Sequence, residues 1–456
     1  MYFRHTLIIF WMLIGWSHGQ EADLRLTAEE RKETLQKIQG LLADNYVFAD
    51  TARKCIDYLR QQIEQGSYDA VTHPRAFVRR LNSELAGIHH DQHLRLSFVS
   101  PESRRFEEAQ PDLALLTRSL DRQRDNYGIK EIKIYPDNIG YISMTSFEPL
   151  EMSRAQIIAA LKLIENTAAV IFDLRQNEGG NLNTVQFICS FFLPAPKLLF
   201  SYYWRRGDYI EHYYILPKIP GSRRPEVPVF ILIGKSTFSA AEEFAYSMQM
   251  QKRALIIGES SGGGANPGYA FEISPRFSIF IPTGRAINPV SNTNWEGKGV
   301  VPDVKATGTA AFTIALDRAG AAARSYQKAI DDQAAGELVV FSALLERLHT
   351  DSTQTNMHNL DSLLNRLAAQ NLIDEWTINT LGYRYLNQNL HSVAIALFSY
   401  NTTHFPESVN AFDSLGEVYY RRGDHEAAKK YYLHSLSLDP NNQNAQHMLK
   451  QIEKGY

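Results

Sequence analysis

The chain has 456 residues, of which 44% are hydrophobic, and its 47 basic and 50 acidic residues leave a formal charge of −3. This length exceeds what one hydrophobic core supports, so two or three domains are expected. The charges form no block of one sign, which argues against a nucleic-acid-binding tail. The only two cysteines, Cys55 and Cys189, exclude a disulfide framework.

The N-terminal segment has the layout of a secretory signal. Arg4 and His5 precede an apolar run, 7–16, which a short polar stretch follows. This pattern predicts a signal peptide, 1–19, cleaved before Gln20, with an uncleaved anchor as the alternative. Because ten apolar residues are too few for a spanning helix, we expect an extracytoplasmic protein with no membrane contact beyond the signal peptide.

Residues 20–100 are predicted to form a helical N-terminal domain. Thr27 and Glu30 have the spacing of a capping box at the start of a helix. Apolar residues at helical spacing predict two further helices, over 51–65 and 73–85.

This domain ends in a histidine-rich segment that contains His89, His90, Asp91 and His93. His89 and His93 have the i, i+4 spacing of two metal ligands on one helical face. However, no glutamate occupies the general-base position of the zinc-protease motif, and 94–98 alternates like a strand, so we expect no metal. A histidine where a loop meets a strand can act as a general base, although a structural role is more common.

The polar segment 101–127 is interpreted as a connection, and 128–335 as a layered α/β core. Its expected elements are, in order, the hairpin 128–135 and 139–144, the helix 153–165, the strand 169–173, the helix 184–192, the strand 229–233, a helix from 240, the strand 254–258, the hairpin 269–273 and 277–281, and the helix 310–330.

Two strand-to-helix turns of this core carry candidate chemistry. Gly179 and Gly180 follow the strand 169–173, and paired glycines at such a turn let backbone N–H groups approach a ligand. The spacing fits neither nucleotide-binding loop. Ser239 lies between the strand 229–233 and a helix, where it is either a helix cap or a nucleophile beside an oxyanion-binding N–H.

The last third of the chain, 336–456, contains a repeat. Six positions recur 34 residues apart: Leu381-Gly382 with Leu415-Gly416, Tyr385 with Tyr419, Ala394 with Ala428, Phe398 with Tyr432, and Pro406 with Pro440. This period with helix–turn–helix patterning predicts an all-α domain of tetratricopeptide repeats. Such repeats bind peptides, dimerise or pack on a neighbouring domain.

Several ordered motifs together resemble the tail-specific, or C-terminal processing, serine peptidase family. They are the segments 173–180, 236–242, 258–259 and 296–303, and the match covers roughly 27–320. The segments around His93 and the hairpin at 138–142 look closest to the branch that contains interphotoreceptor retinoid-binding protein and the tricorn core proteases.

The resemblance implies a crotonase/ClpP-like α/β fold with Ser239 as the nucleophile. One large branch of the family pairs this serine with a lysine in a Gly-Lys-Gly motif, but the corresponding residues here are 262–264, three glycines. The tricorn-like branch instead implies His93 as the base and Glu296 as the acid that orients it. The implied oxyanion donors are the backbone N–H of Ala240 and that of Gly179 or Gly180.

The resemblance therefore favours a secreted or periplasmic serine endopeptidase that cleaves peptides or protein tails, with no cofactor and no metal. Only about thirty residues separate Phe98 from Gly128, too few for the family's peptide-capturing PDZ domain. The repeats are candidates for contact with a protein partner. Two alternatives stay open: an inactive relative that binds apolar ligands such as retinoids or fatty acids, and a protein that acts mainly through its repeats.

Overall fold

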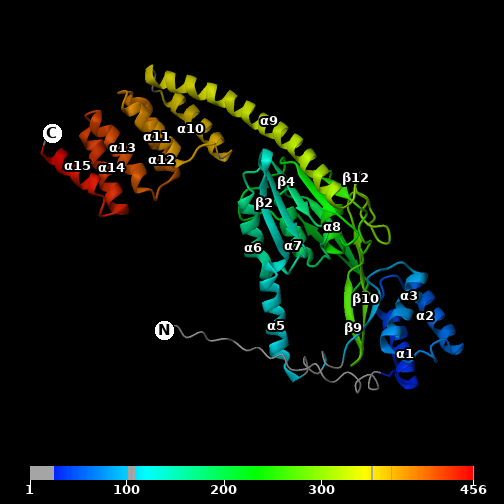
Figure 1. Cartoon of the computed structure of the whole chain (residues 1–456). Coiled ribbons are helices and arrows are strands. Elements are labelled where there is room, and N and C mark those ends of the chain that lie inside the picture. Colours follow the sequence, from blue (N-terminus) through cyan, green and yellow to red (C-terminus); the bar gives the residue numbers. More distant parts are fainter. Residues whose placement is uncertain (1–24, 101–103, 105–108, 351–352, 371, 455–456) are drawn as a thin grey trace, which may run out of the picture. The chain divides into compact units, whose positions relative to one another are not determined.

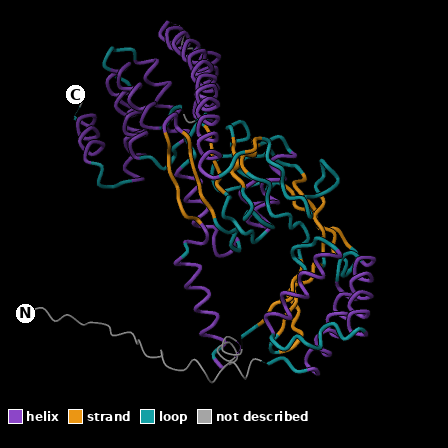
Figure 2. The backbone as a smooth tube through the Cα atoms, turned by 45° about the vertical axis from the view of Figure 1, so that its right-hand side comes forward, coloured by secondary structure: helices purple, strands orange, loops and turns teal. Residues whose placement is uncertain are grey.

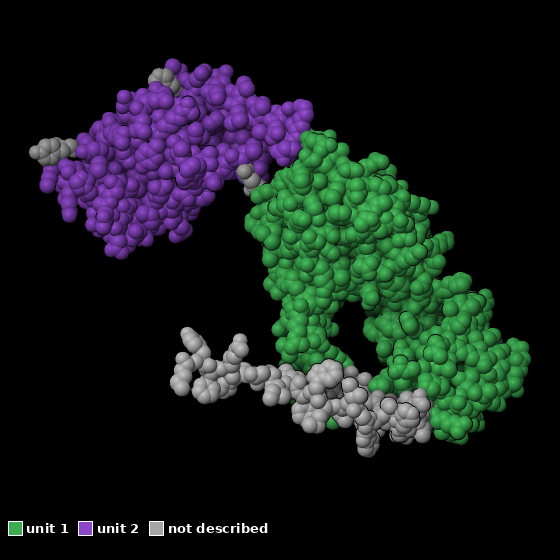
Figure 3. All heavy atoms as spheres, in the orientation of Figure 1, with its two compact units in different colours: residues 1–326 green, residues 327–456 purple. Residues whose placement is uncertain are grey.

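The computed structural model describes residues 25–100, 104, 109–350, 353–370 and 372–454, and the predicted signal peptide, 1–19, lies outside them. The chain divides into two compact units, Met1–Tyr326 and Gln327–Tyr456, coloured separately in Figure 3. Within the described ranges, every helix is too short or too polar to cross a membrane. Cys55 and Cys189 are both buried free thiols.

A six-stranded sheet forms the centre of the first unit, in the order β12-β8-β7-β4-β3-β2. All neighbouring strands are parallel except β2 and β3, which form the predicted antiparallel hairpin. The strands are β2 (Ile129–Tyr135), β3 (Ile139–Met144), β4 (Ala169–Asp173), β7 (Val229–Ile233), β8 (Ala254–Gly258) and β12 (Val304–Lys305).

Helices cover both faces of this sheet because its central strands are apolar on both sides. The strands β4 and β7 are buried at every residue. One face packs against α6 (Leu150–Leu163), α7 (Leu182–Cys189) and α8 (Ala240–Met250). The other face packs against the first part of α9 (Gly308–Thr350), seen in Figure 1. Here the buried residues Ala311, Ala315, Ala319 and Ala323 form a ladder with i, i+4 spacing.

Two three-stranded sheets flank the core. The first joins the N-terminal helices to the rest of the unit, since β1 (Arg95–Phe98) pairs with β10 (Phe277–Pro282), and β10 with β9 (Gly268–Ser274). The second sheet, in the order β11-β5-β6, is not expected from the sequence. Its strands are β5 (Leu198–Trp204), β6 (Tyr209–Tyr214) and β11 (Gly284–Ile287). All described strands of the chain are orange in Figure 2.

The N-terminal domain contains the three predicted helices, α1 (Ala28–Asn45), α2 (Ala49–Glu64) and α3 (Pro74–Ile88). The predicted capping box is present, because the Glu30 N–H donates to the Thr27 hydroxyl and the Thr27 N–H to the Glu30 carboxylate. The segment interpreted as a connection contains a helix, α5 (Pro111–Arg124). A proline in its first turn and two arginines in its last turn favour that helix locally.

The second unit is all-helical over its described residues. It comprises the last part of α9, followed by α10 (Gln354–Ala369), α11 (Glu375–Leu386), α12 (His391–His404), α13 (Val409–Arg421), α14 (His425–Leu438) and α15 (Gln443–Glu453). The repeated glycines let paired helices approach: a Cβ on Gly382 would lie 2.3 Å from Phe398 Cε1, and one on Gly416 would lie 2.9 Å from Tyr432. The sequence pattern predicts a helix over 310–330 at the end of the core, whereas α9 continues without a break to Thr350.

Candidate active site

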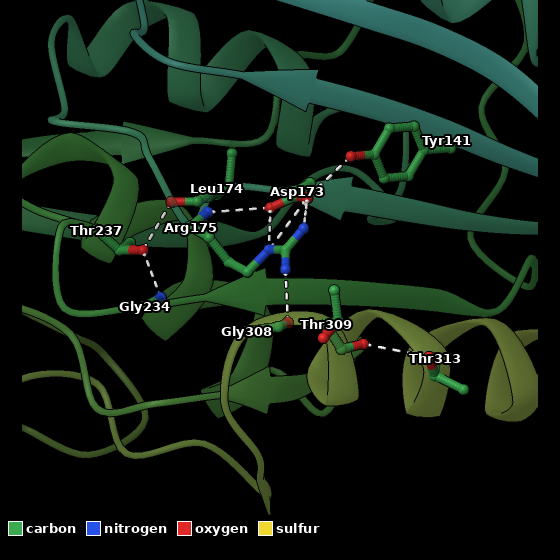
Figure 4. A network of polar contacts seen from close by, with 9 residues as sticks. All are labelled: Tyr141, Asp173, Leu174, Arg175, Gly234, Thr237, Gly308, Thr309 and Thr313. Atoms are coloured by element: carbon green, nitrogen blue, oxygen red, sulfur yellow. Dashed lines mark hydrogen bonds and ion pairs between the residues drawn. The ribbon is translucent and has the colours of Figure 1, made fainter.

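Ser239 occupies a sharp turn between β7 and α8. Its backbone has φ 54° and ψ −120°, which L-residues rarely adopt and which costs on the order of 1–3 kcal/mol. Thr237 stabilises the turn, because its hydroxyl donates to the Leu174 carbonyl (2.7 Å) and accepts from the Gly234 N–H (2.9 Å; Figure 4). Strain that the surrounding bonds maintain is typical of a functional position.

The strand edge beside this turn is fixed by a second network. Asp173, at the end of β4, accepts hydrogen bonds from Tyr141 (2.8 Å) and from Arg175, whose guanidinium also donates to the Gly308 carbonyl (2.7 Å). Figure 4 shows Arg175 reaching from β4 to the start of α9. Asp173 and Arg175 therefore have structural roles in the motif that leads to Gly179.

Glu242 links the turn that contains Ser239, called the serine turn below, to residues 262–264, called the glycine loop. Its side chain is fully buried, and Oε2 accepts from the N–H groups of Ser239 and Gly264, both at 2.9 Å. Oε1 accepts from the Ser261 hydroxyl and the Gly263 N–H, both at 2.6 Å. Burial raises the pKa of Glu242, and these donors oppose that rise. Four donors around one carboxyl require an acceptor-only carboxylate.

The glycine loop is unfavourable for the lysine of the larger branch. Gly263, the middle glycine, has φ 93°, and a Cβ there would lie 3.1 Å from the Gly299 nitrogen and 3.3 Å from the Gly297 carbonyl carbon. A Cβ on Gly264 would lie 2.7 Å from His93 Cε1. The loop instead packs closely on the segment after Glu296 and on the His93 ring.

His93 lies in an apolar environment just before β1. Its ring packs against Phe238 at 4.6 Å and Phe280 at 5.8 Å between centroids. Burial lowers the pKa of His93 to about 4, so its imidazole is neutral at pH 7 and can accept a proton. Its Nδ1 atom is buried and has no hydrogen-bond partner in the described part of the chain.

Two carboxylates lie next to this imidazole. Asp91, His93 and Glu296 each offer one atom within 4.8 Å of the others. Glu296 Oε2 accepts from the Ala265 N–H (2.6 Å), whereas Oε1 is buried without a partner among the described residues. Burial first, and the Asp91 charge next, raise the pKa of Glu296 to about 8. Burial also raises the pKa of Asp91. The closeness of the two carboxyl groups therefore disfavours a negative charge on both at once.

The structure brings His93 and Glu296 together, and it places His93 beside the serine turn through Phe238 and Gly264. No hydrogen bond joins Ser239 to His93, or His93 to Glu296, within the described ranges. The other candidates lie elsewhere. His90 is exposed, and the His89 ring packs on Phe48 (5.7 Å between centroids). Lys235, the lysine four residues before Ser239, has 82% of its side chain exposed and forms an ion pair with Glu259 (3.4 Å).

The oxyanion donors can be ordered by their existing bonds. Gly179 lies directly against Ser239, because a Cβ there would be 2.7 Å from Ser239 Cβ and 3.0 Å from the Ala240 nitrogen. However, the Gly179 N–H donates to Asn177 Oδ1 at 2.9 Å. The N–H groups of Gly180 and Ala240 donate to no protein acceptor in the portion of the chain that the structure describes. They are the better pair of candidates.

Asn177 is a site residue that the sequence does not single out. It is fully buried, its side chain donates to the Met144 carbonyl (3.1 Å), and its own carbonyl accepts from the Phe238 N–H (3.0 Å). Asn177 thus holds the loop that carries Gly179 and Gly180 against the serine turn. An Asn directly before Glu-Gly-Gly at a strand end is the one signal that points to it.

A cavity of about 230 Å³ opens beside Ser239. Its walls come from three loops and from the unpredicted sheet: Gly180, Asn181, Leu182, Asn183, Tyr202, Tyr213, Ser239, Gly264, Ala265, Pro267 and Trp295. Behind this wall, Glu243 accepts from the hydroxyls of Tyr202 and Ser247, both at 2.7 Å. Complete burial raises the pKa of Glu243 to about 7. The cavity has the size of an amino-acid side chain, and its lining combines aromatic and apolar side chains with the polar Asn181 and Asn183.

Comparison with known proteins agrees with the predicted resemblance. Residues 138–306 match peptidase family S41, residues 24–126 match the N-terminal domain of peptidase S41 in eukaryotic IRBP, and residues 409–442 match a tetratricopeptide repeat. The predicted mixed α/β core, helical N-terminal region and C-terminal repeats are confirmed.

Among curated proteins, the chain is similar to carboxyl-terminal-processing peptidase 2 of Arabidopsis thaliana, with 28% identity over 42% of this chain and 38% of that protein. It is also similar to the carboxy-terminal-processing protease of Bartonella bacilliformis, with 27% identity over 40% and 42%. The chain thus spans about two fifths of the length of these relatives. Similar solved structures include the photosystem II D1 C-terminal processing protease, with 16% identity, TM-score 0.39 and coverage of 62% of this chain and 94% of that one.

Proposed function

We propose that this chain, which carries a peptidase S41 domain, is an extracytoplasmic serine peptidase that cleaves peptides or protein tails through an acyl-enzyme. The observation that supports it best is the pair of buried unpartnered atoms, His93 Nδ1 and Glu296 Oε1, within the described residues. In a catalytic triad, a hydrogen bond joins these two atoms of the histidine and the acid. A distance between them that is too long for a hydrogen bond without substrate shortens when substrate binds and excludes water.

In the proposed reaction, Ser239 Oγ attacks the peptide carbonyl carbon while its proton passes to His93 Nε2. Glu296 accepts a hydrogen bond from Nδ1–H and stabilises the imidazolium. The N–H groups of Gly180 and Ala240 bind the oxyanion, and each such donor typically contributes about 3–4 kcal/mol. His93 then protonates the leaving amine, and water hydrolyses the acyl-enzyme by the same steps.

The apolar-ligand alternative receives less support from the cavities. The one beside Ser239 is smaller than the ~300–1,000 Å³ common for small-molecule sites. A cavity of about 700 Å³ between α1 and the β9–β10 turn is lined mainly by polar and charged residues, including Glu30, Glu33, Lys37 and Arg276. We therefore retain the peptidase as the leading hypothesis.

Labelling by a fluorophosphonate, which requires an activated serine, tests the proposal directly. The full-length protein should be labelled and should hydrolyse unfolded casein or tail peptides, and Ser239→Ala should do neither. Ser236→Ala, an exposed serine of the same turn, is the matched control and should behave like the wild type. Equal inertness of the wild type and Ser239→Ala would leave the apolar-ligand alternative in place.

A further inference from the structure

The cluster formed by Asp91, His93 and Glu296 has the composition of a metal site. It offers one imidazole and two carboxylates, whose ligand atoms lie within 4.8 Å of one another. They come from the segment before β1 and from the segment between β11 and β12. Three protein ligands from two separate segments leave a coordination position open for water or substrate, as in catalytic zinc sites.

Each of the three residues offers an atom with an electron pair that is available for a cation. His93 Nδ1 and Glu296 Oε1 are both buried without a hydrogen-bond partner among the described residues. Asp91 Oδ1 accepts one hydrogen bond, from the His93 N–H (3.1 Å), which leaves it one lone pair. Unpartnered buried polar atoms cost free energy, and a cation would satisfy two of them at once.

Two buried carboxylates this close also repel each other. No lysine or arginine forms an ion pair with Asp91 or Glu296 in the part of the chain that the structure describes. His89 lies near enough to act on Asp91, but its ring packs between aromatic side chains. A divalent ion between the two carboxylates would supply the missing positive charge.

Outer hydrogen bonds hold the ligands in position. Asp91 Oδ2 accepts from the Tyr46 hydroxyl and from Asn266 Nδ2, both at 3.1 Å, and Glu296 Oε2 accepts from the Ala265 N–H. Such bonds orient the first ligands of metal sites and raise affinity. Ligand atoms of a tetrahedral zinc ion with bonds of about 2.1 Å lie about 3.4 Å apart, so the separations in the cluster, which reach up to 4.8 Å, need to shorten by up to about 1.4 Å.

We propose that Asp91, His93 and Glu296 bind one transition-metal dication of the Zn²⁺ type and that the bound ion inhibits the peptidase. An imidazole with two carboxylates suits Zn²⁺ and its neighbours, whereas Mg²⁺ and Ca²⁺ prefer six or more oxygen ligands. The binding claim stands on the cluster alone. The inhibition rests on the proposed function.

Inhibition follows from the two nitrogens of the imidazole. A metal on Nδ1 of neutral His93 leaves the ring proton on Nε2, so Nε2 cannot accept the proton of Ser239. The metal also occupies Glu296 Oε1, the acceptor that the triad requires. The bound metal therefore prevents His93 from acting as the base and Glu296 from orienting it, while it makes no contact with Ser239.

Binding is tested without any enzymatic readout. The purified full-length Ser239→Ala protein, titrated with Zn²⁺ by calorimetry, should bind one ion per chain through this cluster. His93→Ala and Glu296→Gln in the same background should each weaken that binding about tenfold or more, whereas the exposed neighbour His90→Ala should not. Thermal unfolding of each variant verifies that it is folded. The site is overturned if the Ser239→Ala protein binds no Zn²⁺, or if the folded His93→Ala and Glu296→Gln proteins bind Zn²⁺ as tightly as the Ser239→Ala protein does.

Co²⁺ gives a spectroscopic check, because its visible absorption reports a low-coordinate site with nitrogen and oxygen ligands. Zn²⁺ should also abolish fluorophosphonate labelling of the wild type, EDTA should restore it, and Mg²⁺ should have no effect. Retained Zn²⁺ binding with unchanged labelling overturns the inhibition. Retained Zn²⁺ binding with no labelling under any condition leaves the site standing and removes the peptidase proposal instead.

Discussion

The nucleophile side and the base side of the candidate site differ in how their polar groups are bonded. On the nucleophile side, Glu242 accepts four hydrogen bonds, and Asn177 bonds to Gly179 of its own loop and to Met144 and Phe238 of two other segments. On the base side, His93 and Glu296 each keep a buried atom without a partner among the described residues. The first arrangement fixes a strained turn. The second leaves the base and acid able to pair with each other, with substrate groups or with a cation.

The largest expected effect concerns the base. His93→Ala should reduce peptide hydrolysis by about 10⁴-fold or more, because a triad acts as a unit. The fold should be retained, since the lost Nδ1 atom makes no hydrogen bond to the described residues. Steady-state rates and thermal unfolding measure the two quantities, with the exposed His90→Ala as the control. A His93→Ala protein with wild-type rates would show that another group activates Ser239.

On the nucleophile side, Gly179→Ala should reduce the rate by about 10³-fold, comparable to the loss of an oxyanion donor. The new Cβ would lie 2.7 Å from Ser239 Cβ, at a backbone φ of 104° that alanine disfavours. Gly207→Ala is matched in backbone, with φ 91°, but lies in the exposed β5–β6 turn. If both variants lose activity equally, the effect is general backbone strain and not crowding of the nucleophile.

Glu242→Gln should destabilise the protein by about 3 kcal/mol, because an amide cannot accept from all four donors and leaves buried N–H groups unpaired. Chemical denaturation at pH 7 measures the change in the free energy of unfolding. A change below ~1 kcal/mol would mean that the carboxylate is not what holds the turn.

The neighbouring Glu243→Gln should have a smaller effect that depends on pH. The folded protein holds the Glu243 proton up to about pH 7, whereas the unfolded chain loses it near pH 4.5. The folded state therefore binds more protons in this interval, and this contribution to stability falls as the pH rises from 4.5 to 7. Glutamine does not titrate, so the variant does not lose this stability. The free energy of unfolding of the variant minus that of the wild type should therefore rise by about 2 kcal/mol from pH 5 to pH 8. A difference that stays constant with pH would exclude Glu243 as the titrating group.

Elements with strong local patterns were predictable from the sequence. The apolar run of β7, the acids at the start of α8 and the capping box at Thr27 each depend on residues within a few positions. The β5–β6–β11 sheet was missed, since β11 lies about eighty residues from β5 and its pairing leaves no local signal.

The same distinction applies to the site residues. Ser239, His93 and Glu296 were selected by resemblance, whereas Asn177 and Glu242 act through contacts that only the fold creates. Asp91 accepts from Asn266, 175 positions away in the chain. No periodicity or short motif encodes a bond of that length, so its role next to His93 required the structure.

The close packing of Gly263 on residues 297–299 limits how this chain can change its catalytic base by mutation. A lysine at position 263 requires a different backbone there and displaces the segment that carries Glu296. A single codon change therefore adds a new base only by disturbing the old one. Substitutions in the glycine loop and in the glutamate segment are therefore expected to be non-additive, because the two segments are in contact.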